Sequence, residues 1–270
     1  MSGVIVMAEL AGRTALVTGG SRGIGAATAR SLAGLGARVV LTYRNSRAEA
    51  AAVAAECGDT ECGSAVVLHA DLEGQAGVDA LLAELHEVAP AIDIVVDNAG
   101  ASLPRGGLLA FPTEQITDKL ASDIAILHRL IQGLVPGMHR RGFGRVIAIT
   151  SGHALGPSAP GMAAHGVTKA AIEALVHYAA TELGHDGVTI NAIRPGFVST
   201  DSSSDVPEQI REALTRTIPA RRLATAQDIA SIVALIAQPA SQWVNGVAIP
   251  AAGGLNYPTD WARVYPAAYA

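Results

Sequence analysis

Short apolar runs alternate with longer alanine-rich stretches along most of the chain. The short runs are continuous, which is typical of strands buried on both faces of a parallel sheet. They predict strands over Thr14–Thr18, Arg38–Tyr43, Ser64–His69, Ile92–Asp97, Arg145–Thr150, Val188–Ile193 and Val247–Pro250. The stretches between them predict helices over Gly25–Leu35, Arg47–Glu56, Gly77–Val88, Thr113–Arg141, Gly161–Leu183 and Thr225–Ala237. This alternation predicts an α/β, doubly wound fold, a seven-stranded parallel sheet with helices on both faces.

The chain shows no linker, low-complexity stretch or internal repeat that would divide it. It therefore predicts one domain over residues 1–270. One irregular region, Phe197–Leu223, is polar and serine-rich, contains a short helix and follows a predicted strand. Such an insertion predicts a mobile lid over a site. An extended tail over residues 255–270 follows.

Composition narrows the class of protein. Half of the residues are hydrophobic and 16% are charged, which favours a compact globule. A net charge of −5 argues against a nucleic-acid partner. No apolar run approaches the roughly twenty residues that span a bilayer, and the short apolar start lacks the basic residues of a signal peptide. We therefore expect a cytoplasmic protein without a membrane partner. Cys57 and Cys62 predict reduced thiols in a surface loop, not a metal site.

The first predicted strand runs directly into the turn Gly19-Gly20-Ser21-Arg22-Gly23-Ile24-Gly25 and then into a helix. Glycines let the main chain approach a diphosphate closely, and a helix N-terminus attracts the anion. The strand before, the helix after and the second strand that follows are the context of a dinucleotide site in a Rossmann fold. An ordinary tight turn is the alternative that the glycines alone leave open.

The second predicted strand ends in Tyr43 and Arg44 and carries no carboxylate. A carboxylate at this place would bind the ribose hydroxyls of NAD. Arg22 in the turn adds a second guanidinium, and arginine suits a 2′-phosphate. The sequence thus favours NADP(H) over NAD(H), with two solvated surface arginines as the alternative.

These residues and several later motifs resemble the short-chain dehydrogenase/reductase family over essentially the whole chain. The motifs are Thr18-Gly19-x-x-x-Gly23-x-Gly25, Asp71-Leu72, Asn98-Ala99-Gly100, Pro195-Gly196 with Thr200, Asn245-Gly246 and Gly253-Gly254. Asp97 and Ala252 stand where the family usually has Asn and Asp. The cofactor-binding residues that the turn, the strand ends and the resemblance together imply are Gly19, Ser21, Arg22, Gly23, Ile24, Gly25, Tyr43, Arg44, Asp71, Leu72, Asn98, Ala99, Gly100, Lys169, Pro195, Gly196 and Thr200.

In that family a Ser, a Tyr, a Lys and an Asn carry out hydride chemistry on a carbonyl or alcohol. The resemblance implies that Ser151 holds the substrate oxygen and that Lys169 binds the nicotinamide ribose. Lys169 is one of two lysines, the other being Lys119, beside seventeen arginines. A lysine in so lysine-poor a chain suggests a role that arginine cannot fill.

Two of the four catalytic positions depart from the family. His165 stands where the Tyr is expected, one residue further from Ser151 than usual, and Asp123 stands where the Asn is expected. Imidazole, with a pKa of about 6.5, is a plausible proton donor, although its reach is roughly one to two ångströms shorter. Lys169 would push His165 toward neutrality, and Asp123 would oppose it. We hypothesise that an acid–imidazole pair of Asp123 and His165 replaces amide and phenol.

The leading hypothesis is an NADP(H)-dependent carbonyl reductase for a small to medium apolar molecule. Its pocket would be lined by His153, Leu155, Met162 and Phe197. The alternative is a cofactor-binding protein without redox activity, either a regulatory subunit or an isomerase or dehydratase. A third option is another proton donor, His153 or a tyrosine of the tail (Tyr257, Tyr265 or Tyr269). By resemblance, the helices at 113–141 and 161–183 would pack between subunits of a homodimer or homotetramer.

Overall fold

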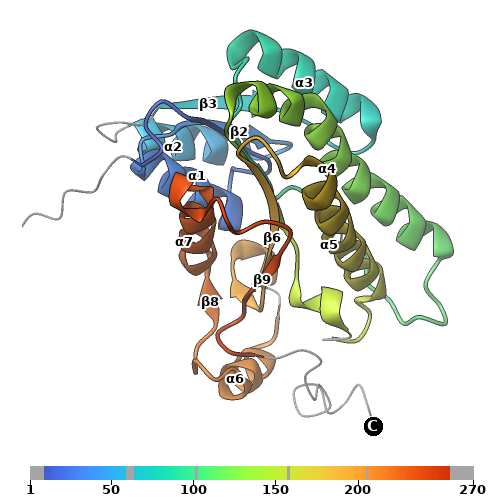
Figure 1. Cartoon of the computed structure of the whole chain (residues 1–270). Coiled ribbons are helices and arrows are strands. Elements are labelled where there is room, and N and C mark those ends of the chain that lie inside the picture. The colour runs from blue at the N-terminus through green and yellow to red at the C-terminus, as the bar shows by residue number, and fades with distance from the viewer. Residues whose placement is uncertain (1–8, 59–63, 101–102, 157–158, 205, 256–270) are drawn as a thin grey trace, which may run out of the picture.

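A parallel β-sheet forms the centre of the protein, as the computed structural model shows (Figure 1). The structure describes residues 9–58, 64–100, 103–156, 159–204 and 206–255. The strands are β1 (Thr14–Val17), β2 (Arg38–Tyr43), β3 (Ser64–His69), β4 (Ile94–Asp97), β5 (Gly144–Ile149), β6 (Val188–Pro195) and β9 (Ala248–Ala251). They pair in parallel in the order β3-β2-β1-β4-β5-β6-β9. The predicted seven-stranded parallel sheet of a Rossmann fold is confirmed.

Helices cover both faces of this sheet (Figure 1). One layer holds α1 (Gly23–Gly34), α2 (Arg47–Gly58) and α7 (Ala226–Ala237), and the other holds α3 (Gln75–Val88), α4 (Thr113–Arg141) and α5 (Ala163–Leu183). Successive strand residues point to opposite layers, so Leu16 of β1 joins one apolar core and its neighbours Ala15 and Val17 join the other. Because both faces are buried, the strands are apolar throughout. The predicted boundaries lie within two residues of the observed ones.

The region predicted as a lid joins β6 to α7. It contains β7 (Val198–Ser199), a 3₁₀ turn, α6 (Glu208–Thr217) and β8 (Ala224–Thr225), and β7 pairs in parallel with β8. Leu214 of α6 is buried against Phe197 and Leu223, which gives the region a small core of its own. The predicted short helix is present, while the mobility of the region stays a prediction.

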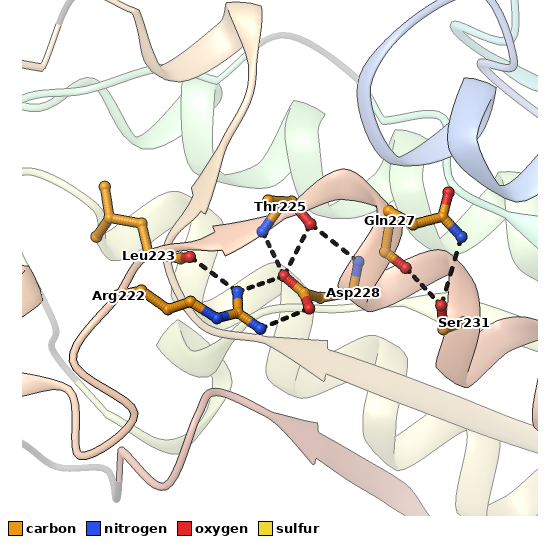
Figure 2. A network of polar contacts seen from close by, with 6 residues as sticks. All are labelled: Arg222, Leu223, Thr225, Gln227, Asp228 and Ser231. Atoms are coloured by element: carbon orange, nitrogen blue, oxygen red, sulfur yellow. Dashed lines mark hydrogen bonds and ion pairs between the residues drawn. The ribbon is translucent and has the colours of Figure 1, made fainter.

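A polar network fastens the end of this region to α7 (Figure 2). The guanidinium of Arg222 donates to both carboxylate oxygens of Asp228, at 2.6 and 2.7 Å. Thr225 caps α7, because its Oγ1 accepts from the backbone N–H of Asp228 at 3.2 Å while Asp228 Oδ2 accepts from the N–H of Thr225 at 2.7 Å. The hydrogen bonds lower the pKa of Asp228 far below its usual range.

The cysteine prediction is corrected in part. Cys57 lies in α2 and is completely buried in the apolar core, because the helix runs to Gly58 and turns this side chain inward. Cys62 and the tail beyond Leu255, with its three tyrosines, lie outside the described residues. Within the described ranges no group of His, Cys, Asp and Glu side chains could hold a metal ion. None of the described helices is long and apolar enough to cross a membrane.

Candidate functional site

A cavity of about 620 Å³ lies at the carboxyl ends of the strands. The order of the strands reverses between β1 and β4, and ligands of doubly wound sheets bind at such a switch point. The sequence-predicted residues that line it are Gly19, Ser21, Arg22, Gly23, Ile24, Tyr43, Arg44, Asp71, Leu72, Asn98, Ala99, Gly100, Asp123, Ser151, His153, Met162, His165, Lys169, Pro195, Gly196, Phe197 and Thr200. Residues separated by up to 181 positions in the sequence, from Gly19 to Thr200, therefore share one cavity.

The glycine turn at one end of the cavity has the geometry of an anion cradle. Gly19 and Gly23 adopt φ values of +63° and +56°, which side chains other than glycine rarely allow. Gly25 does not line the cavity, but a Cβ there would meet the carbonyl oxygen of Gly19 and lie 2.7 Å from Asn98 Nδ2. No side chain caps the N-terminus of α1 at Arg22, and its first turn carries no acidic residue. Its N–H groups suit a phosphate.

Side chains from the first and fourth strands hold the turn in place. Thr18 Oγ1 accepts from the backbone N–H groups of Asn98 and Ala99 at 3.0 and 2.9 Å. In return, Asn98 Nδ2 donates to the carbonyl oxygens of Thr18 and Gly19 at 3.0 and 3.1 Å. The Asn98-Ala99-Gly100 motif thus has a structural role, because it fastens the end of β4 to the turn after β1.

Directly after β2, Arg44 faces two carboxylates. Its guanidinium lies 2.5 Å from Glu73 Oε1 and 3.9 Å from Asp71 Oδ1. Glu73 lines the cavity and was missed by the sequence analysis, which searched only the second strand for a carboxylate. The signal was available, because β3 pairs with β2 in parallel and the residues after both strands meet at one edge. The pair is exposed, so it adds little to stability.

The opposite end of the cavity holds the predicted catalytic residues. Ser151 follows β5 and caps the 3₁₀ turn Gly152–Leu155, with its Oγ accepting from the N–H of His153 at 3.3 Å. His165 and Lys169 come from α5, and Asp123 comes from α4. All four side chains line the cavity together, while their catalytic roles remain a proposal.

One predicted pocket residue is misplaced. Leu155 does not line the cavity, and 47% of it is exposed to solvent. A 3₁₀ turn has three residues per turn, so residues two apart do not share a face. His153 therefore faces the cavity while Leu155 turns away from it. Met162 and Phe197 do line it, as predicted.

Both lysines of the chain converge on Asp123. Lys119 Nζ lies 3.0 Å from Asp123 Oδ2, and Lys169 Nζ lies 3.8 Å from the same oxygen. Lys169 also donates to the carbonyl oxygen of Ile149, at 3.2 Å. All three charged side chains are buried. The sequence analysis missed Lys119 as a site residue, although its spacing of four from Asp123 on one helix was the signal.

The acid–imidazole pair suggested by the sequence is not formed. Within the described part of the chain, no hydrogen bond or ion pair joins Asp123 to His165, and His165 Nδ1 is buried without a hydrogen-bond partner. The ring of His165 instead meets the ring of His153 edge-on, with centroids 5.4 Å apart. Lys119 Nζ is the group that donates a hydrogen bond to the carboxylate of Asp123.

The two histidines of the cavity are neutral at neutral pH. Burial, followed by the charge of Lys169, lowers the pKa of His165 to about 3. Burial, followed by the charge of Arg105, lowers the pKa of His153 to about 4. The expected push of His165 toward neutrality by Lys169 is confirmed in direction. This end of the cavity therefore presents neutral imidazoles among ammonium groups.

A second ion-pair network holds α5 against the sheet near Lys169. Glu173 lies one turn after Lys169 and is buried. Its carboxylate accepts from Thr150 Oγ1 at 2.8 Å and from two nitrogens of Arg194 at 2.9 and 2.5 Å. Thr150 follows β5 and Arg194 lies in β6, so the network fixes the helix that carries both His165 and Lys169.

Asp97, at the end of β4, is a buried acid behind the site. Burial raises its pKa to about 7, while Lys169 and a hydrogen bond of 3.3 Å from Thr18 Oγ1 partly oppose that rise. Because the unfolded chain releases this proton at lower pH, the wild type loses stability as the pH rises from about 4 toward 7.

We expect Asp97→Asn to remove this loss, because the amide stays neutral. Near pH 4 the free energies of unfolding of the two proteins should differ little. At pH 8 the free energy of unfolding of the variant should be higher by a few kcal/mol, because each pKa unit corresponds to roughly 1.4 kcal/mol. Urea unfolding at pH 4.5, 6 and 8 measures this. Asp118→Asn, an exposed change of the same charge, is the control. A stability difference that does not vary with pH would contradict the assignment.

Comparisons with known proteins agree with this geometry. A family model described as enoyl-(acyl carrier protein) reductase matches residues 19–256. The 3-oxoacyl-[acyl-carrier-protein] reductase FabG of Pseudomonas aeruginosa is 36% identical over 250 residues, covering 92% of this chain and 98% of that protein. The hydroxynaphthalene reductase-like protein Arp2 of Metarhizium anisopliae is 34% identical over 263 residues, covering 91% and 96%.

Solved structures show the same likeness. A 3-oxoacyl (acyl-carrier-protein) reductase from Agrobacterium tumefaciens, solved with NADP bound, has a TM-score of 0.85 at 32% identity, covering 94% of this chain and 99% of that one. A short-chain dehydrogenase/reductase from Serratia marcescens has a TM-score of 0.83 at 31% identity, covering 91% and 98%. The chain therefore belongs to the short-chain dehydrogenase/reductase family of oxidoreductases.

Proposed function

We propose that this chain is an NADP(H)-dependent carbonyl reductase in which His165 takes the place of the family's tyrosine. The observation that carries the proposal is the single cavity, which runs from the glycine turn to Ser151, His165 and Lys169. Its apolar walls, among them Leu103, Met162 and Phe197, suit a ketone of a small to medium apolar molecule. The named reductases among the relatives support the reaction class.

The residues at the turn fit NADP(H). Because Gly25 has no side chain, the turn packs closely on Asn98 and leaves room for a diphosphate. The uncapped N-terminus of α1 supplies backbone N–H donors for it. Arg22, in the turn, and Arg44, after β2, both line the cavity and would hold a 2′-phosphate. The Agrobacterium relative was solved with NADP bound. When bound here, NADPH would supply a hydride to the carbonyl carbon.

The protein's own part is to orient the carbonyl oxygen and to manage its charge and proton. Ser151 Oγ would donate a hydrogen bond to that oxygen, and the ammonium of Lys169 would stabilise its growing negative charge. His165 would approach as a neutral ring, donating a hydrogen bond. Negative charge on the oxygen favours the protonated ring, which can take a proton from solvent and pass it on. Burial and the neighbouring cations disfavour the protonated ring of His165 until negative charge develops on the substrate oxygen.

Turnover is tested with NADPH and a panel of ketones, diketones, quinones and a 3-oxoacyl thioester, with the alcohol product measured directly. We expect the wild type to reduce at least one member of the panel. Lys169→Met, which keeps the side chain's length without its charge, is expected to lose at least about 100-fold in kcat. An enzyme that binds NADPH but reduces no member of the panel would overturn the proposal.

Arg44 should set the preference for NADPH over NADH. Arg44→Ala is expected to weaken NADPH binding roughly 10- to 100-fold and to leave NADH binding unchanged, because a charge-assisted hydrogen bond is worth about 1.5–3 kcal/mol. Glu73→Gln should strengthen NADPH binding modestly, since it releases Arg44 from its ion pair. Isothermal titration with both cofactors measures these changes. Arg47→Ala, an exposed arginine outside the cavity, is the control, and equal losses for both cofactors would contradict the role.

A second candidate function rests on the placement of His165, Lys119 and Lys169 in the wall of one cavity. A neutral imidazole can accept a proton from the carbon next to a carbonyl, and an ammonium group would stabilise the enolate, which is the chemistry of an isomerase or dehydratase. The lowered pKa of His165 makes it a weak base, which is why carbonyl reduction is proposed first. Such a protein would exchange substrate hydrogen with deuterated water and consume no NADPH. Product analysis of the same panel in deuterated water separates the two functions.

A further inference from the structure

The buried cluster around Asp123 holds two lysine side chains. Lys169 comes from α5, and Lys119 comes from α4, one turn before Asp123. Both ammonium groups approach the same carboxylate oxygen, Oδ2, and both side chains line the cavity. Asp123 is therefore an ion-pair partner of both lysines.

The distances show which lysine Asp123 binds more closely. Lys119 Nζ donates a hydrogen bond to Oδ2 at 3.0 Å. Lys169 Nζ stands 3.8 Å from that oxygen, beyond hydrogen-bonding distance, and donates to the carbonyl oxygen of Ile149 at 3.2 Å. Lys119 thus occupies the side of the carboxylate onto which Lys169 would otherwise close.

Stability alone is a poor reason for this arrangement. Taking charges out of water is costly, and apolar residues of similar size often replace a buried ion pair without loss. Lys119 is 5% exposed and Asp123 is 2% exposed, so both are largely removed from bulk water. An ion pair kept at that cost in the wall of a cavity points to a role in the site.

The charges around Lys169 give this role a direction. Lys119 and Asp123 face it from α4, Asp97 faces it from β4, and His165 lies one turn before it on its own helix. Asp123 and Asp97 favour the ammonium form of Lys169, while burial and Lys119 oppose it. Removing Lys119 would take away the cation that lies nearest to Asp123 Oδ2 and leave Lys169 as the other ammonium group beside that oxygen.

We propose that Lys119 is a positioning residue, which engages Asp123 so that Lys169 stays on Ile149 and keeps its ammonium available to the bound dinucleotide. The inference takes one thing from the proposed function, namely that Lys169 holds a bound NADPH. Lys119 then supplies a hydrogen-bond donor and Asp123 an acceptor, the two groups that one asparagine side chain would supply. Substitution of either one alone should therefore harm the site more than substitution of both.

The test uses the fact that the chain has only two lysines. Protein labelled with ¹³C at the lysine Cε gives one NMR signal for each, and Lys119→Met leaves the signal of Lys169 alone. Its titration midpoint is measured in the wild type, Lys119→Met, Asp123→Asn and the double variant, with Asp118→Asn as a control on an exposed site of the same helix. No ketone is needed, so the result does not depend on turnover.

We expect the midpoint of Lys169 to rise by about one pH unit in Lys119→Met and to fall by a similar amount in Asp123→Asn. The double variant and Asp118→Asn should stay near the wild type. NADPH affinity at pH 7.5 should drop roughly tenfold in Lys119→Met and recover in the double variant, a rescue worth about 1.4 kcal/mol. Loss of a neighbouring cation raises the midpoint of Lys169 in any case, so the positioning role is read from NADPH affinity: a merely structural pair would show neither the loss in Lys119→Met nor the recovery in the double variant.

A midpoint that does not move in Lys119→Met, or that falls, overturns the inference. If Lys119→Met does not fold, the double variant is compared with Asp123→Asn, and the double variant is expected to bind NADPH more tightly, because a single substitution should harm the site more than both. Equal affinities of these two variants would overturn the inference. A wild type that reduces no ketone refutes the proposed function and leaves this titration intact. A wild type that binds no NADPH overturns both.

Discussion

Gly25→Ala is expected to weaken NADPH binding roughly 10- to 100-fold and to destabilise the protein by about 1–3 kcal/mol. The added Cβ would meet the carbonyl oxygen of Gly19 and lie 2.7 Å from Asn98 Nδ2, closer than Cβ atoms approach other heavy atoms in proteins. Neither neighbour can yield, because Gly19 is backbone and Asn98 is fixed by hydrogen bonds to the turn. The turn must therefore open, and its N–H groups would no longer converge on a diphosphate.

Fluorescence titration with NADPH and thermal unfolding measure both effects. Gly34→Ala is the matched control, because it lies on the same helix and an added Cβ there meets nothing within 4 Å. That variant should bind NADPH as the wild type does and be as stable or more stable, since alanine favours a helix over glycine by up to about 1 kcal/mol. If the two variants bind NADPH equally well, the turn is not the cradle.

His165→Ala is expected to lower kcat by about 100- to 10,000-fold with little change in NADPH affinity, as the loss of a proton-transfer group does. His165 lies in the cavity with its Nδ1 buried and without a partner. Because the pKa of its ring is held near 3 by burial and neighbouring cations, the pH profile between 5 and 8 should show no step that His165→Ala removes. Steady-state kinetics of both proteins measure this, with His128→Ala, an exposed histidine, as the control.

His165→Tyr distinguishes the two readings of the departure from the family. An active wild type that loses its turnover in His165→Ala establishes His165 as part of a working, altered site. A silent wild type with an active His165→Tyr variant would mean that the scaffold has given up carbonyl reduction, and the second candidate function would then be pursued. Equal turnover by the wild type and His165→Ala would remove His165 from the mechanism.

The dinucleotide half of the site could be predicted because its causes are local. The spacing of Gly19, Gly23 and Gly25 between a strand and a helix needs no distant contact to be understood, and the strand order follows from the alternation of elements. Even here the ion pair of Arg44 with Glu73 was missed, because it forms across two parallel strands whose pairing becomes definite only in the fold.

The four candidate catalytic residues were predicted to lie together, and they do, but their contacts were not predicted and their catalytic roles stay a proposal. Ser151, His165, Lys169 and Asp123 do line one cavity, but the partner of Asp123 is Lys119 and not His165. Which residue pairs with Asp123 depends on how α4 packs against α5, and no short stretch of the sequence determines that packing. Leu155 was misplaced for a smaller reason, because the 3₁₀ turn after Ser151 directs His153 and Leu155 to different sides.

The central claim, hydride chemistry at an altered family site, is tested most directly by following one isotope. The wild type is incubated with NADPH doubly deuterated at nicotinamide C4 and with the ketone panel, and the products are analysed by mass spectrometry. The account predicts an alcohol with one deuterium on its carbinol carbon, formed in equal amount to the NADP⁺. Deuterium that stays in NADPH, while the holoprotein leaves every ketone unreduced, would contradict it.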